Sequence, residues 1–289
     1  MKIVRTIKEI KEEISSHRLK GRTIGFVPTM GALHSGHLSL VEPCKRENDV
    51  TVVSVFVNPA QFGPTEDFDR YPRDFQKDES MLREAGVDLV FYPDTIEIYP
   101  PGFSLYIDVG NFGSVLCGKS RPTHFRGVAT VVLKLFNIVK PDNAYFGQKD
   151  AQQALLLKRM AVDFNLDVTV KAMPIIRDED GLALSSRNVY LSVEEREAAL
   201  AFPRALRKAY ERIQSGLRVV AQVKDVIREE INKSSLVSID YIEIVRLETL
   251  EAFPESPEGR IINMSNTLVA GAVWVGKTRL IDNFILGEI

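Results

Sequence analysis

Cysteine is scarce in this chain: only Cys44 and Cys117 occur among its 289 residues. The two lie far apart in the sequence, and no further thiol is present to complete a thiolate zinc site or a framework of disulfides. This scarcity fits a reducing cytoplasm, where disulfides are rare. We expect both side chains to be buried as small hydrophobic groups rather than to act as reactive thiols.

Long apolar runs and an excess of either charge are also missing. No stretch of about 18 apolar residues occurs, so no membrane span is expected. The first residues, MKIVRTIKEI, lack the apolar centre of a secretory signal. Lysine and arginine number 37 against 39 aspartates and glutamates, a formal net charge of -2, so no strong global field recruits nucleic acid. The length allows a large core and more than one domain.

Short apolar, β-branched runs alternate with helical periodicity in the first part of the chain. Strands are predicted at 23–27, 49–57, 87–91, 143–146 and 166–173. Helices are predicted at 5–20, 34–46, 74–85, 128–139 and 152–164. This alternation predicts an α/β domain with a Rossmann-like parallel sheet. The segment 99–124, rich in proline and glycine, is expected to carry a β-hairpin or a lid.

The pattern changes near residue 176. Helices rich in Glu, Arg and Ala are predicted at 192–213 and 219–232, and strands of an antiparallel sheet at 239–245, 261–266 and 267–275. We therefore expect two domains: residues 1–175 as the Rossmann-like domain, and residues 176–289 as a smaller α+β domain that forms a lid over the site.

The most informative segment is PTMGALHSGH at 28–37, between a strand and a helix. A helix N-terminus presents unpaired N–H groups and the positive end of the helix dipole, which suits phosphate. His34 and His37, three residues apart, could donate hydrogen bonds to charge that develops there. Surface or capping roles for the two histidines, and metal ligation, are the alternatives; two histidines without Cys or carboxylate partners make a poor zinc site.

Two further segments carry groups that suit a nucleotide. Phe146-Gly147-Gln148-Lys149-Asp150 follows a strand, so Lys149 could meet a phosphate and Asp150 a ribose hydroxyl; a solvated charged turn is the alternative. Leu184-Ser185-Ser186-Arg187-Asn188 offers hydroxyls and a guanidinium, although Ser185 or Ser186 could simply cap a helix.

Amide side chains supply a possible second subsite. Gln61 follows the strand at 49–57 and can donate and accept hydrogen bonds, which suits a carboxylate or hydroxyl substrate. Gln153 lies three residues after Asp150 and could meet the same ligand. The segment RPTHFRG at 121–127 adds cationic groups before a helix.

Six segments taken together resemble the pantoate–β-alanine ligase family, in that family's order: PTMGALHSGH, VFVNPAQF, YPR at 71–73, RPTHFRGV, YFGQKD and LALSSRN. HSGH is also similar to the HIGH element of class I aminoacyl-tRNA synthetases and nucleotidyltransferases. Departures are Ala60 and Leu184, where the family often has Met, and Gln148, where it often has Glu. They affect the pocket lining rather than groups that the chemistry requires.

The resemblance implies ATP-dependent condensation of (R)-pantoate with β-alanine through a pantoyl adenylate, in a cytoplasmic homodimer that uses Mg²⁺. It implies catalytic roles for His37, His34 and Lys149. ATP contacts are implied for Met30, Gly31, Ala32, Leu33, His34, Ser35, Gly36, His37, Gly147, Gln148, Lys149, Asp150, Ile176, Leu184, Ser185, Ser186 and Arg187. Pantoate contacts are implied for Gln61, Gln153, Met30 and Phe62, with Gln61 also on β-alanine, and Asp78 is a weak candidate for outer-shell help to Mg²⁺.

Two other functions stay open at this point. One is a different HIGH-type nucleotidyltransferase or adenylate-forming ligase, which would release pyrophosphate without any dependence on pantoate. The other is a non-catalytic nucleotide-binding or RNA-binding module, which would bind ATP tightly without turnover. The net charge of -2 argues against RNA, and the intact set of HSGH, Lys149 and SSR argues against the loss of catalysis.

Overall fold

The computed structural model describes residues 1–64, 66–253 and 262–287. The chain divides into two compact units. The N-terminal unit comprises 1–114, 118–148 and 153–174, and the C-terminal unit comprises 115–117, 149–152 and the described part of 175–289. The main division therefore lies between Pro174 and Ile175, and two short segments from earlier in the chain belong to the C-terminal unit.

The N-terminal unit is built on a parallel sheet in the order β1-β4-β3-β2-β5-β6, with six strands among the described residues. The strands are β1 (Lys2–Val4), β2 (Ile24–Thr29), β3 (Val50–Val55), β4 (Leu89–Phe91), β5 (Asn143–Gly147) and β6 (Thr169–Met173). The chain runs from β2 to β3 and β4 on one side and then crosses to β5 and β6 on the other. This switch point between β2 and β5 is where open parallel sheets bind ligands.

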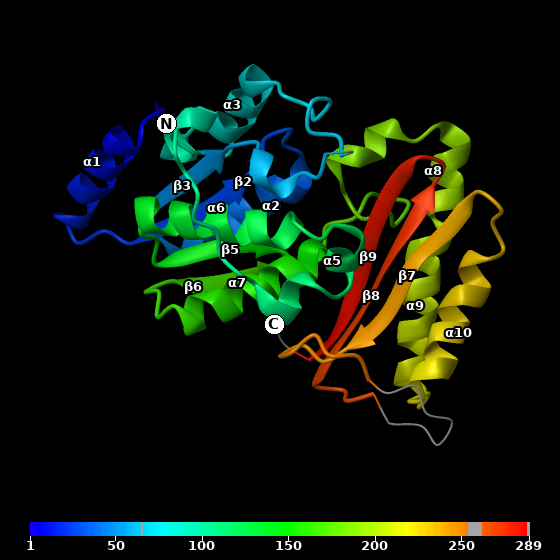
Figure 1. The fold of residues 1–289 in the computed structure, drawn as a ribbon. Coiled ribbons are helices and arrows are strands. Elements are labelled where there is room, and N and C mark those ends of the chain that lie inside the picture. Colours follow the sequence, from blue (N-terminus) through cyan, green and yellow to red (C-terminus); the bar gives the residue numbers. More distant parts are fainter. Residues whose placement is uncertain (65, 254–261, 288–289) are drawn as a thin grey trace. The chain divides into compact units, whose positions relative to one another are not determined.

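The helices of this unit are α1 (Ile7–Arg18), α2 (Ser35–Glu47), α3 (Phe75–Glu84), α4 (Thr95–Ile98), α6 (His124–Val139) and α7 (Ala151–Asp163), which begins in the 149–152 segment. Helix α1 packs beside α6, and α2 packs across β2, β3 and β5 (Figure 1). All six side chains of β3 are buried, as its β-branched run predicts for a central strand. Cys44, a residue of α2, is buried, and burial raises the pKa of its thiol to about 12, so the expected role as a small hydrophobe is confirmed.

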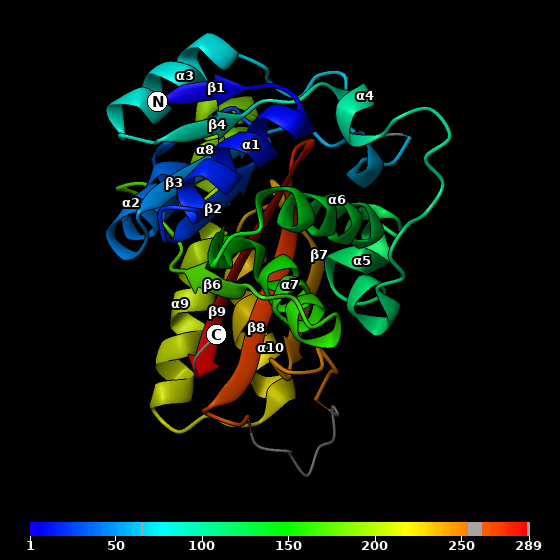
Figure 2. The same cartoon turned by 90° about the vertical axis from the view of Figure 1, so that its left-hand side faces the viewer.

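The C-terminal unit is a smaller α+β unit with an antiparallel sheet in the order β7-β8-β9, three strands in its described part. Its elements are α8 (Val193–Ala199), α9 (Ala201–Gln214), α10 (Val220–Ile231), β7 (Val237–Val245), β8 (Asn266–Val275) and β9 (Thr278–Gly287). Helices α9 and α10 lie side by side along this sheet (Figure 2) and bury Phe202, Ile213 and Ile227 in its core. The predicted fold class is confirmed.

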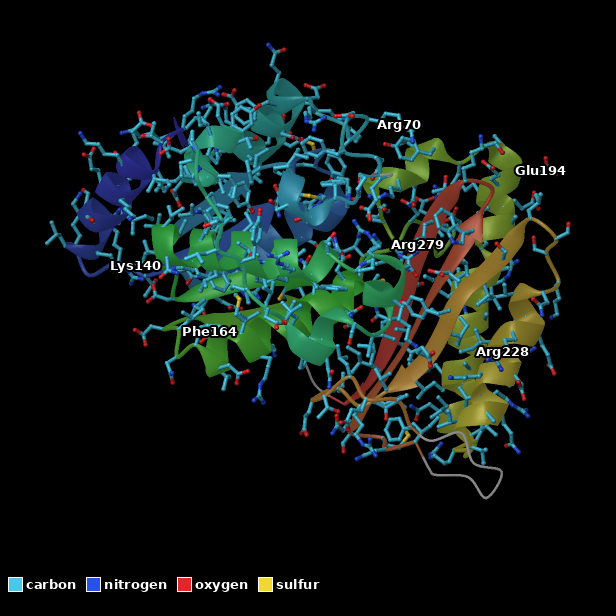
Figure 3. The ribbon with its side chains drawn as sticks, in the orientation of Figure 1. Arg70, Lys140, Phe164, Glu194, Arg228 and Arg279 are labelled. Atoms are coloured by element: carbon cyan, nitrogen blue, oxygen red, sulfur yellow. The ribbon has the colours of Figure 1, made fainter. Side chains whose placement is uncertain are left out.

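The two early segments of the C-terminal unit are joined to each other and to its sheet. Gln152 Oε1 accepts the N–H of Cys117 at 3.0 Å, and Gln152 Nε2 donates to the carbonyl of Val115 at 2.8 Å. Cys117 Sγ lies 3.1 Å from the Tyr241 hydroxyl on β7. Arg279 on β9, labelled in Figure 3, donates to Cys117 Sγ and forms an ion pair with Asp240 at 2.7 Å. Cys117 is thus buried, as expected.

Several sequence predictions for individual elements were wrong. Strand β1 was missed, because three residues are too few for a periodic signal. The segment 99–124 holds neither a strand nor a hairpin; it contains the short helical turns η2 (Gly110–Gly113) and α5 (Cys117–Ser120). The predicted helix 192–213 is broken at Leu200.

The predicted strand at 261–266 is also wrong for residues 262–265, which are not a strand, and residue 261 lies outside the described residues. The strand that pairs with β8 on its other side is instead β9, which the sequence analysis missed. Helix α6 begins at His124, earlier than predicted.

Candidate functional site

A buried aspartate shapes the turn that leads from β2 to α2. Asp78 on α3 is 2% exposed and accepts the N–H of Ala32 at 3.0 Å and the N–H of Leu33 at 2.7 Å. Gly31 has a φ of +80, and a Cβ there would lie 2.8 Å from Asp78 Oδ2, so this position requires glycine. Burial raises the pKa of Asp78, and the two N–H groups act in the opposite direction. The carboxyl group therefore holds the backbone of the turn through both of its oxygens.

The two histidines form a pair at the start of α2. His34 is the N-cap residue, and its Nδ1 accepts the N–H of Gly36 at 3.1 Å. His37 Nδ1 accepts the N–H of His34 at 3.4 Å, and the two rings lie 4.1 Å apart. The capping alternative is therefore right for the local structure. Because each Nδ1 accepts a hydrogen bond, the hydrogen of each neutral ring is on Nε2, which makes Nε2 the donor.

The predicted pantoate residues Met30 and Gln61 lie together after β2 and β3. Gln61 is 8% exposed at the end of the turn η1 (Pro59–Gln61), and its Nε2 lies 2.9 Å from Met30 Sδ. Phe62 follows and packs edge-on against Phe68 and Tyr71. Helix α6 approaches this turn so closely that a Cβ at Gly127 would lie 2.1 Å from the Ala60 carbonyl oxygen.

Arg121 and His124 hold the backbone of the same turn. The Gln61 carbonyl oxygen lies 3.0 Å from His124 Nδ1 and accepts a hydrogen bond from Arg121 at 3.4 Å. Arg121 also donates to both carboxylate oxygens of Glu66. Burial alone would raise the pKa of Glu66, but the Arg121 guanidinium, with smaller contributions from His124 and the Gly63 backbone, lowers it below its ordinary value. The segment RPTHFRG therefore positions Gln61 through its main chain.

The end of β5 brings further predicted residues to the same edge of the sheet. Phe26 pairs with Ala144, and three residues later Thr29 and Gly147 end the two strands. Gln148 begins the turn η3 (Gln148–Asp150), and Gln153 lies in the first turn of α7. Gly147 and the turn after β2 thus flank the switch point of the sheet.

The remaining predicted nucleotide residues belong to the C-terminal unit. The N–H of Leu184 donates to the Ile176 carbonyl at 3.0 Å, so these two residues join across a short hairpin. Ser185 caps η4 (Ser186–Tyr190) by accepting the N–H of Arg187 at 3.3 Å, which confirms the capping alternative for its local structure. Lys149 is half-buried and Asp150 is exposed.

Two buried polar residues of β9 anchor these segments. Asp282 and Asn283 are each 3% exposed. Asp282 accepts two hydrogen bonds from Arg177, at 2.6 and 2.9 Å, and so holds the hairpin that contains Ile176 and Leu184. Asn283 Nδ2 donates to the Lys149 carbonyl at 3.0 Å. On α8, Arg196 forms ion pairs with Asp178 and Asp180 of the same hairpin.

Four features of the site were not predicted from the sequence: Asn58, Asp282, Asn283 and the role of Asp78. Asn58 stands in the quoted VFVNPAQF segment, so a signal for it existed. The contacts of the other three join residues far apart in the chain, and no local pattern indicates them. Among residues 1–64, 66–253 and 262–287, no group of three or more His, Cys, Asp or Glu side chains could hold a metal ion. No helix in the same ranges has the length and apolar character needed to cross a membrane.

Known proteins match this chain over nearly its whole length. The model of the pantoate-beta-alanine ligase family matches residues 2–285. The pantothenate synthetase of Caldicellulosiruptor bescii is 53% identical over 286 residues, which cover 99% of each chain. That of Fervidobacterium nodosum is 54% identical over 286 residues, again 99% of each chain.

Solved structures agree as well. The pantothenate synthetase of Thermus thermophilus has a TM-score of 0.91 at 44% identity and 100% coverage of both chains. The pantoate-beta-alanine ligase of Francisella tularensis, solved in complex with Beta-gamma ATP and Beta-alanine, has a TM-score of 0.79 at 38% identity and covers 99% of this chain and 97% of its own. With full-length matches in sequence and in structure, the chain belongs to the pantoate–β-alanine ligase family.

Proposed function

We propose that the turn Met30–His37 binds the triphosphate of ATP and that Gln61, Gln153, Met30 and Phe62 bind pantoate. The chain is a ligase of pantothenate synthesis, and ATP is its substrate. One observation carries the assignment of the turn: both histidines accept backbone N–H groups at Nδ1 and so present Nε2–H donors at a helix N-terminus, beside the switch point of the sheet. The Francisella relative, complexed with an ATP-type ligand and β-alanine, supports ATP and β-alanine as substrates.

The reaction has two steps. A pantoate carboxylate oxygen attacks the α-phosphorus of ATP and expels pyrophosphate, which leaves pantoyl adenylate. The amine of β-alanine then attacks the acyl carbon, loses a proton and expels AMP. Negative charge develops on phosphate oxygens in the first step, so fixed N–H donors and cations stabilise its transition state.

We assign the other residues by their chemistry. Lys149 neutralises phosphate charge, and Ser185, Ser186 and Arg187 bind phosphate oxygens. Asp150 and the Gly147 backbone hold ribose, while Ile176 and Leu184 pack near adenine. The proposed ATP contacts are completed by Gly31, Ala32, Leu33, Ser35, Gly36 and Gln148. The C-terminal unit is proposed as the lid that the sequence analysis expected, because it carries these hydroxyl and cationic groups.

Magnesium enters this proposal as part of the substrate, MgATP. The described residues do not fit a resident ion, because they hold no cluster of metal-binding side chains and both oxygens of Asp78 accept backbone N–H groups. A homodimer in the cytoplasm remains our proposal from the family resemblance. Sedimentation of the purified protein tests the dimer. Assaying AMP formation while omitting pantoate, β-alanine, ATP or Mg²⁺ in turn tests the reaction: AMP that forms without pantoate would contradict it.

Gln61→Ala is expected to raise the KM for pantoate by about 10–100-fold, the loss expected for one hydrogen bond to a charged group. The KM for ATP should change by less than about threefold, because the amide faces Met30 rather than the His34–His37 pair. Steady-state kinetics with each substrate varied measures both values. Equal increases in both KM values would show that Gln61 has a general structural role.

Asp78→Asn is expected to lower both stability and the kcat/KM for ATP. An asparagine has one acceptor oxygen for the two N–H groups of Ala32 and Leu33, so we expect a loss of about 1–3 kcal/mol in the free energy of unfolding. Urea unfolding and kinetics measure the effect, and Glu79→Gln, which alters only a surface ion pair, is the control. Rescue of Asp78→Asn by excess Mg²⁺ would instead favour a role in holding the metal.

A further inference from the structure

The amide of Asn58 has an orientation that its neighbours determine. Asn58 follows β3 and is 1% exposed, and its side chain makes four hydrogen bonds within the N-terminal unit. Its Oδ1 accepts the N–H of Ala60 at 3.2 Å, and its Nδ2 donates to the carbonyl of Gly127 at 3.2 Å. A main-chain N–H can only donate and a carbonyl can only accept, so these two contacts decide which side of the amide is oxygen.

The orientation of the Asn58 amide in turn determines that of the Gln61 amide. Asn58 Nδ2 also donates to Gln61 Oε1 at 3.0 Å. The Gln61 oxygen is therefore engaged on the side of Asn58, and its NH₂ group points the other way, toward Met30 Sδ. Gln61 thus presents donors at the proposed pantoate subsite. A donor suits the carboxylate and hydroxyl oxygens of pantoate and does not suit an ammonium group.

Tyr99 completes this chain of hydrogen bonds from outside the turn. It follows α4, and its hydroxyl donates to Asn58 Oδ1 at 2.7 Å. Its ring packs edge-on against Phe103, with centroids 4.9 Å apart, and lies near Phe56. Burial raises the pKa of Tyr99 well above its ordinary value, which keeps the hydroxyl protonated and able to donate.

We infer that Tyr99 is a positioning residue for pantoate: its hydroxyl, through Asn58, holds the Gln61 amide with its NH₂ group toward the substrate. The inference rests on the proposed role of Gln61. Tyr99 contacts neither substrate in this scheme, so its removal should weaken pantoate binding moderately and leave ATP binding unchanged.

The test is Tyr99→Phe, which keeps the ring and removes only the hydroxyl. We expect the KM for pantoate to rise by about 3–10-fold, the net loss of one neutral hydrogen bond, while the KM for ATP stays within about twofold. Tyr106→Phe is the matched control, because Tyr106 belongs to the same row of rings through Phe103. Thermal unfolding of both variants shows whether the fold is retained.

A double-mutant cycle separates positioning from a structural role. In the Gln61→Ala background, Tyr99→Phe should have no further effect on the KM for pantoate, because the amide that it positions is gone. Additive effects, or an equal rise in the KM for ATP, would overturn the inference. If Gln61→Ala itself left the KM for pantoate unchanged, the proposed pantoate subsite would fail, and the role of Tyr99 would fail with it.

A second variant tests the same chain of hydrogen bonds by reversing the orientation of the Gln61 amide. In Asn58→Asp, assayed at a pH where the new carboxyl group is ionised, both side-chain oxygens only accept, so Gln61 must turn its NH₂ toward residue 58 and its oxygen toward the substrate. We expect the KM for pantoate to rise at least as much as in Gln61→Ala. A smaller rise than in Gln61→Ala would show that the orientation of the amide is unimportant, which also contradicts the inference.

Discussion

Replacement of His37 by alanine is expected to lower kcat by about 10²–10⁴-fold, the range for a positioned acid or a donor to developing negative charge. His37 accepts the His34 N–H at Nδ1, so Nε2 is its donor, and we propose that this donor stabilises the transition state of adenylation. Stopped assays of pyrophosphate release at saturating substrates measure the effect.

Two conservative variants serve as matched controls for this prediction. In His37→Gln the amide nitrogen reaches approximately the position of Nε2, whereas in His37→Asn it reaches approximately that of Nδ1. Partial activity in the Gln variant alone would support donation from Nε2. An alanine variant with near wild-type turnover would remove His37 from the mechanism, and equal losses in Gln and Asn would point to the ring's capping role instead.

The Lys149→Ala variant should fail mainly in the first half-reaction. In the first step, pyrophosphate leaves a pentacoordinate phosphorus, and much negative charge develops on the phosphate oxygens. In the second step, AMP leaves the acyl carbon, and less charge needs to be compensated. The cation therefore matters more for adenylation. The Lys149 carbonyl that accepts from Asn283 remains in the variant, so its anchoring to β9 should survive. We expect adenylate formation to fall by at least about 10²-fold, and the reaction of supplied pantoyl adenylate with β-alanine to fall much less.

Single-turnover measurement of each half-reaction tests this order of events. Lys277→Ala, an exposed lysine in the turn between β8 and β9, is a control for the loss of one positive charge from the same unit. If both half-reactions of Lys149→Ala fell by the same factor, Lys149 would act on binding or folding, and its assignment to the first transition state would be wrong.

The centre of the parallel sheet was predictable because the side chains of its central strands are buried on both faces. Strand β3 is an unbroken run whose side chains are all buried, so its composition indicates a central strand. Strand β9 could not be found in this way, because Asp282 and Asn283 interrupt its apolar pattern. Those two residues are polar because they bind Arg177 and the Lys149 carbonyl, contacts that exist only in the folded unit. The polar residues that anchor the candidate site therefore removed the apolar pattern by which β9 could have been predicted.

The sequence predicted which segments form the candidate site, but not the hydrogen bonds that orient their side chains. The strand–turn–helix pattern around PTMGALHSGH locates a turn at a strand end, and the structure has that turn. The tautomers of the two histidines could not be predicted, because they depend on which backbone N–H each ring accepts. The contacts of Asp78 span 45 and 46 residues, and only the packing of α3 brings that carboxylate to the turn. The assigned roles of the site residues stay predictions.

The discontinuous C-terminal unit limits how this enzyme could be recombined with its relatives. A chimera joined at residue 175 would combine β9 of one protein with the 115–117 and 149–152 segments of another. Asn283 would then meet a foreign Lys149 segment, and Arg279 a foreign residue in place of Cys117. Exchange of the unit as one continuous block therefore separates residues that contact each other in this chain, whereas transfer of all three segments keeps those contacts within one parent sequence.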